Sequence, residues 1–76
     1  MKELVEYLTK NLVEEPDAVL VDEKERGRGI VDMRLHVARE DMGRVIGRNG
    51  RVANAIRNLV RVAAARQGKK VNLEIR

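Results

Sequence analysis

Apolar side chains recur at helical spacing between Lys2 and Glu14, with charged residues around them. This spacing predicts an amphipathic helix whose apolar stripe faces a core. Pro16 limits the helix, because a proline inside a helix removes a backbone hydrogen bond and clashes with the preceding turn. The predicted stripe consists of Leu4, Val5, Leu8 and Leu12.

The pattern changes to that of β-strands after Ala18. The β-branched run Val19–Val21 favours a strand, and the glycines at 27 and 29 signal a turn. Beyond the turn, apolar and polar residues alternate with the period of a half-buried strand. The two runs therefore predict a hairpin, whose second strand carries Val31, Met33, Leu35 and Val37 on its apolar face.

A short helix is predicted next, beginning at Glu40 and Asp41, because acidic side chains stabilise the N-terminus of a helix. Gly47 ends this helix. A longer helix runs from Gly50 or Arg51 to Arg66, and Gly68 can cap its end. Its predicted core face consists of Val52, Ile56, Leu59, Val60 and Ala63.

Alternation at Val71, Leu73 and Ile75 predicts a last strand. The element order is helix, strand, strand, helix, helix, strand. This order predicts an α+β fold for a single domain, residues 1–76, with helices packed on one face of a three-stranded mixed sheet.

Charge is distributed unevenly along the chain, although the net charge is only +4. Residues 1–25 carry three basic and eight acidic side chains, a net of −5, whereas residues 26–76 carry thirteen basic and four acidic ones, a net of +9. Eleven of the sixteen basic residues are arginine, which suits bidentate contact with phosphate. The charge alone fits a polyanion-binding surface and a solvated arginine-rich surface equally well.

Composition also bears on where in the cell the protein is expected and on which bound groups it can hold. The absence of cysteine excludes disulfides and thiolate metal sites. No leader segment and no apolar run of about 20 residues is present, so we expect a cytoplasmic protein without a membrane span. We expect no metal and no cofactor.

The segment Gly47-Arg48-Asn49-Gly50 is the strongest candidate for chemistry. Glycines at both ends permit a sharp turn and a close approach of phosphate to the backbone. The helix that follows presents unpaired N–H groups and the positive end of its dipole, and Arg44 and Arg51 flank the turn. Two glycines three residues apart also fit an ordinary interhelical turn.

The stretch from Val45 to Arg57 resembles the KH signature: an aliphatic pair, GxxG, and a helix with spaced aliphatic residues. The element order resembles the bacterial type II KH domain, and the whole chain resembles the small KhpA (YlqC-like) family. One position departs from the signature, because Ala53 stands where a larger aliphatic residue is usual.

This resemblance implies that the chain binds single-stranded RNA and that the GxxG loop clamps the phosphate backbone of about four nucleotides. The chain has a single aromatic residue, Tyr7, so aromatic platforms for base stacking are excluded. The bases would instead contact aliphatic side chains. The implied RNA-binding residues are Gly47, Arg48, Asn49, Gly50, Arg51, Arg44, Ile46, Val52 and Arg57.

Catalysis is not expected, because the chain has neither serine nor cysteine. His36 falls on the polar face of its strand, and Glu40 and Asp41 are neighbours that would not share a helix face. The GxxG turn lacks the spacing and the lysine of a nucleotide-binding P-loop. We therefore expect no small-molecule substrate.

A protein-pairing surface is a further hypothesis. A small apolar strip interrupts the polar side of the long helix, and it would support a homodimer with two GxxG loops; partial cover by the last strand or by arginine stems is the alternative. The candidate interface consists of Ala55, Asn58, Val62 and Ala65.

The family resemblance implies pairing with itself and with a larger KH-containing protein of the KhpB (Jag or EloR) type. It further implies RNA-chaperone or post-transcriptional work linked to cell elongation and division. The alternative function is that of a protein adaptor, whose main role is pairing with a larger RNA-binding partner.

Overall fold

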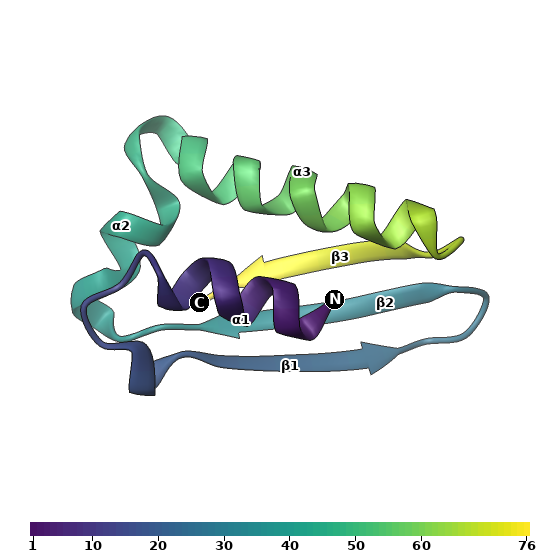
Figure 1. The fold of residues 1–76 in the computed structure, drawn as a ribbon, viewed down its shortest axis with the longest axis horizontal. Helices are drawn as coiled ribbons and strands as arrows, with labels where there is room; N and C mark the ends of the chain where they lie inside the picture. The colour runs from purple at the N-terminus through teal and green to yellow at the C-terminus, as the bar shows by residue number, and fades with distance from the viewer.

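The helices and strands follow one another in the predicted order in the computed structural model, which describes residues 1–76 (Figure 1). Short 3₁₀ turns precede β1, α2 and α3; they are η1 (Pro16–Ala18), η2 (Arg39–Asp41) and η3 (Arg48–Gly50). The helices and strands are α1 (Lys2–Lys10), β1 (Leu20–Glu25), β2 (Ile30–His36), α2 (Met42–Ile46), α3 (Arg51–Arg66) and β3 (Lys70–Ile75). The predicted α+β class is confirmed.

The three strands form one mixed sheet in the order β1-β2-β3. β1 and β2 are antiparallel, with Leu20 opposite His36 and Glu25 opposite Val31, whereas β3 runs parallel to β2. β1 is longer than its β-branched run predicted. Its charged C-terminal half is tolerated because β1 is an edge strand that is open to solvent.

The first helix is shorter than predicted and ends at Lys10 rather than near Glu14. The backbone N–H groups of Glu14 and Glu15 donate to the side chain of Asp41 instead of to carbonyls of α1. A contact with a residue 27 positions later therefore ends this helix before Pro16 can act.

The core lies between the sheet and the helices on its one covered face (Figure 1). The inward side chains of β2 meet those of the helices there, and the largest fully buried apolar residues are Val5, Val31, Met33, Leu35, Val45 and Val60. Thr9 is also fully buried, and its hydroxyl has no hydrogen-bond partner. The core places Met33 and Val45 out of reach of a bound ligand.

The prediction that Leu59 lies on the core face of the long helix is wrong, because its side chain is 52% exposed. The buried face of α3 consists of Ala53, Ile56, Val60 and Ala64. Leu59 stands beside that face, where α1 and α3 diverge, and Leu12 beyond the end of α1 is likewise 41% exposed.

The charge division of the sequence becomes a division in space. α1 packs along β1 at one edge of the sheet, and α3 packs along β3 at the other edge (Figure 1). The acidic segment 1–25 includes α1 and β1, and the basic remainder includes α3 and β3. α3 contains four arginines and no acidic residue, so the α3–β3 edge is the positive side of the molecule.

Candidate nucleic-acid interface

The turn between α2 and α3 is built from left-handed backbone positions. Gly47, Asn49 and Gly50 have φ angles of 75°, 56° and 75°, which side-chain-bearing residues other than asparagine and aspartate rarely adopt. The Gly47 N–H donates to the Gly43 carbonyl at 2.9 Å and closes α2. The Gly50 N–H donates back to the Gly47 carbonyl at 3.2 Å and tightens the turn.

The two glycines of the turn are needed for different reasons. A Cβ atom on Gly47 would lie 2.5 Å from Cγ2 of Val52 and 2.9 Å from its backbone nitrogen, so no side chain fits. A Cβ atom on Gly50 would meet nothing closer than the Asn54 amide at 3.9 Å. Gly47 is thus required by space and by conformation, and Gly50 by conformation alone.

The N-terminus of α3 opens directly onto this turn. Its N-cap is Gly50, which offers no side-chain hydrogen bond to the first-turn N–H groups, and the first turn contains no acidic residue. The Arg51 N–H already donates to the Arg48 carbonyl. The later N–H groups of this turn and the positive end of the helix dipole could hold an anion. The predicted clamp residues Arg48, Asn49 and Arg51 are exposed around it, and neither arginine forms a salt bridge.

Arg44 differs from the other arginines near the turn, because its guanidinium is already paired. It donates to the Glu14 carboxylate and lies 3.8 Å from the Asp41 carboxylate. Arg44 therefore links α2 to the connection between α1 and β1. An anion at the turn would compete with Glu14 for this side chain.

Asp41 also holds the segment between α1 and β1 in place, and this role was not predicted. Its carboxylate is 1% exposed and accepts the backbone N–H groups of Glu14 and Glu15, each at 3.0 Å. It makes no capping hydrogen bond to α2, although the sequence placed it at the start of that helix. No local pattern reveals a contact between residues so far apart in the chain.

Arg57 lies on the side of α3 that faces β3. Its Nε donates to the Leu73 carbonyl at 3.2 Å, and Nη1 lies 3.4 Å from the Asn54 side-chain oxygen. The half-buried guanidinium thus joins α3 to the free edge of β3. An arginine carries five N–H donors, so donors remain for a ligand. We call the line along which α3 packs against β3 the α3–β3 seam.

The apolar candidates Ile46 and Val52 are both half-buried and close to the core. Val52 lies on the side of α3 that faces α1, across the helix from Arg57. The predicted RNA-binding residues therefore meet at the GxxG turn but diverge along α3.

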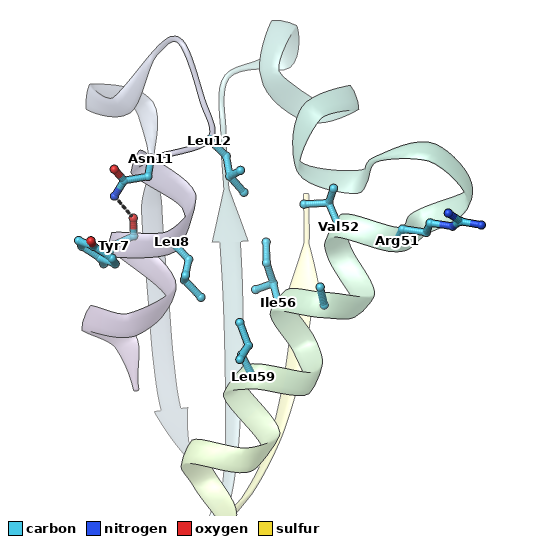
Figure 2. A pocket seen from close by; sticks show the side chains of 9 residues that line it. Tyr7, Leu8, Asn11, Leu12, Arg51, Val52, Ile56 and Leu59 are labelled. Carbon is cyan, nitrogen blue, oxygen red and sulfur yellow. Dashed lines mark hydrogen bonds between the residues drawn. The ribbon is translucent and has the colours of Figure 1, made fainter.

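An open apolar groove runs between α1 and α3 (Figure 2). Its volume is about 570 Å³. Leu8, Leu12, Ile56 and Leu59 point into it from the two helices, whereas Arg51 points away toward the GxxG end. Sequence reasoning missed this groove, because the pattern of each helix alone does not show how far apart the two helices lie.

The four candidate pairing residues are exposed and spaced three or four positions apart, so they follow one strip along α3, but they border different hollows. Ala55 lines the apolar groove, and Val62 is 55% exposed one turn beyond Leu59 on the same flank of α3. Asn58 is exposed, and Ala65 lies in a separate hollow at the end of α3, among basic side chains.

The structure contains neither a cluster of metal-ligating side chains nor a helix suited to cross a membrane. No group of three or more metal-ligating side chains is present. None of the helices combines the length and the apolar character that crossing a membrane requires.

Three comparisons place the chain among known proteins. The family model described as KhpA/KhpB, KH domain, matches residues 2–75. A protein named RNA-binding protein KhpA from Clostridium perfringens is 49% identical over 75 residues, which cover 99% of both chains. Proteins of the same name are 51% identical in Caldanaerobacter subterraneus subsp. tengcongensis, over 99% of both chains, and 43% in Listeria monocytogenes, over 99% of this chain and 97% of the relative.

The fold also resembles part of a larger solved protein. Aquifex aeolicus Era bound to GDP·AlF4⁻ matches 97% of this chain with a TM-score of 0.67 and 21% identity, and the chain spans 28% of that protein. Era in complex with MgGDPNP and nucleotides 1506–1542 of 16S ribosomal RNA matches with a TM-score of 0.61, 20% identity and the same coverage. The match of the family model over residues 2–75 and the identity to the KhpA relatives show that the chain belongs to the KhpA/KhpB family of KH-domain proteins.

Proposed function

We propose that this chain is a cytoplasmic protein that binds single-stranded RNA at the GxxG turn and along the basic α3–β3 edge. The observation that carries the proposal is the N-terminus of α3, which no side chain caps and which opens on a turn that has no room for a side chain at Gly47. The names of the KhpA relatives, which describe RNA-binding proteins, support the same function.

The turn acts on the phosphate backbone. A phosphate sits against the first-turn N–H groups of α3, where Gly47 permits close approach. Arg48 and Arg51 supply charge, and Asn49 supplies hydrogen bonds. Arg44 joins them when an RNA phosphate replaces Glu14 as its partner.

The bases are held with little sequence preference. Arg57 offers N–H donors in the α3–β3 seam, and Ile46 and Val52 offer aliphatic surface beside the turn. The only aromatic residue, Tyr7, is on α1, at the acidic edge of the molecule. Binding therefore depends mainly on phosphate contacts and weakens as salt concentration rises.

The double variant Arg48→Asp with Asn49→Asp tests this function. Both residues are exposed, and aspartate tolerates the left-handed position 49, so the variant keeps its circular dichroism spectrum and melting temperature. We expect it to lose affinity for single-stranded RNA by a factor of at least about 10, measured by fluorescence anisotropy.

The matched control is Lys2→Gln with Lys24→Asp, which removes the same amount of positive charge from the acidic edge. It should bind RNA like the wild type. If the loop variant retained wild-type affinity, the assignment of the turn would be wrong.

We propose the cellular role on the strength of the family membership. The chain acts as an RNA chaperone or post-transcriptional regulator, as a homodimer or with a larger KH-containing partner of the KhpB type, and influences cell elongation and division. Crosslinking in living cells, followed by sequencing of the bound RNA and identification of bound proteins, tests this role. Recovery of neither RNA nor a KH-containing partner would contradict it.

A second candidate function is that of a pairing module. Four of the five large apolar side chains that are exposed lie along the α1–α3 groove or beside it: Tyr7, Leu12, Leu59 and Val62. Two copies that meet through this surface would bury the groove and leave both GxxG turns free.

Sedimentation of the variant Leu59→Glu tests the pairing. We expect a dimer for the wild type and a monomer for the variant, because a carboxylate buried at the interface has no partner. Gln67→Glu is a control for added charge at an exposed polar site just beyond α3, outside the candidate interface. A wild type that stays monomeric at high concentration would remove the homodimer.

A further inference from the structure

A second hollow lies where α3 ends and β3 begins. Its volume is about 320 Å³, and it is lined by Arg61, Ala65, Lys69, Lys70, Val71 and Asn72. It lies at the end of α3 opposite the GxxG turn (Figure 1). None of the RNA contacts described above reaches it.

The hollow carries positive charge that the chain itself does not neutralise. Arg61 and Lys70 are exposed and form no salt bridge. Lys69 is paired with Glu25, with Nζ and Oε1 3.6 Å apart. The only acidic residue after α2 is Glu74, and Arg34 and Arg76 are its partners.

The hollow is continuous with the proposed RNA-binding side of α3. Arg57 and Arg61 are four residues apart, so they lie on one face of the helix, and Ala65 follows after another four. Arg57 contacts the edge of β3 through the Leu73 carbonyl, so this face borders the α3–β3 seam. The seam therefore leads from the turn to the hollow.

The far hollow lies the length of α3 away from the GxxG turn. α3 has 16 residues and at 1.5 Å per residue is about 24 Å long. A KH clamp holds about four nucleotides. A phosphate at the far hollow would therefore belong to a nucleotide at or beyond the end of the segment that the turn holds.

We propose that the RNA strand continues along the α3–β3 seam and that Arg61 and Lys70 bind a second phosphate, at the far end of α3. The inference rests on the proposed RNA binding at the turn. Arginine offers a paired N–H fork to a phosphodiester, and lysine adds a mobile point charge. The chain consequently prefers strands longer than the clamp requires, even when it acts as a single copy.

The test compares two lengths of single-stranded RNA, oligoadenylate and oligouridylate of about four and about twelve nucleotides. The variant Arg61→Gln with Lys70→Gln should bind the long strands about tenfold more weakly and the short strands within about twofold of the wild type. The dependence of log K on log salt for the long strand should become shallower by about 0.7, since each phosphate neutralised on a single strand contributes about 0.7 and the variant loses one.

The control Lys2→Gln with Lys24→Gln removes two unpaired cations from the acidic edge and should change neither affinity nor slope. Equal binding of the long strands by the Arg61 and Lys70 variant and the wild type would overturn the second phosphate site. So would equal losses for both lengths. A wild type that binds neither length refutes the proposed function itself, which separates the two failures.

Discussion

Gly47 is the residue on which the shape of the candidate site depends most. The GxxG spacing predicted its importance, but the sequence gives no reason why the two glycines should differ. The structure supplies that reason, because only Gly47 packs against Val52. Its ψ angle of 175° with φ at 75° is also a combination that is almost restricted to glycine.

Gly47→Ala should therefore destabilise the domain by about 3 kcal/mol, through backbone strain and a clash with the backbone of Val52. Gly50→Ala should cost only about 1 kcal/mol, because the left-handed position is its single requirement. Urea unfolding of the two variants measures the difference. Equal losses of stability would contradict the distinction between the two glycines.

Thr9, unlike Gly47, lies in no motif that predicted its importance. Its side chain is fully buried, and its hydroxyl has no partner. Thr9→Val should stabilise the domain by about 1 kcal/mol, because the variant no longer buries an unsatisfied polar group. The measurement is thermal unfolding, in which about 1 kcal/mol corresponds to about 4–8 °C for a domain of this size. A lower melting temperature would indicate that the hydroxyl is satisfied in solution.

At the scale of the elements, periodicity predicted the order and type of every helix and strand. It failed where contacts between residues distant in the chain determine where an element ends or which side chain is buried. α1 ends at Lys10 because of Asp41, and Leu59 is exposed because α1 and α3 diverge. The pairing of Arg44 with Glu14 was equally invisible, since 30 residues separate the two partners. Each failure is a tertiary contact that no local window contains.

Asp41 is the contact that positions α2, and the variant Asp41→Asn measures its strength. An asparagine can accept one of the two N–H groups, but its own NH₂ group would face the other. We expect a loss of about 2 kcal/mol, typical of hydrogen bonds to a buried charged group. Urea unfolding measures it.

Glu40→Gln is the matched control for Asp41→Asn, because Glu40 is an exposed neighbour that forms no ion pair. Its stability should stay within about 0.5 kcal/mol of the wild type. An equal, small effect of both substitutions would show that the hydrogen bonds between Asp41 and the α1–β1 connection contribute little to stability.

At the scale of the whole molecule, the charge division predicted a polyanion-facing part but not its shape. The fold places the acidic segment along β1 and the basic segment along β3 (Figure 1). α3 then presents its basic side to the β3 edge and an apolar flank to α1 (Figure 2). The candidate residues of both functions lie on this one helix, and the sequence alone could not separate its two sides.

The most direct measurement is an NMR titration of the isotope-labelled protein with a short single-stranded RNA. The backbone amide signals of residues 47–53 and of the α3 residues that face β3 should shift, in proportion to the bound fraction. The signals of α1 and β1 should stay in place. Shifts that gather on α1 or β1 while the turn remains unchanged would contradict the account that RNA binds at the GxxG turn.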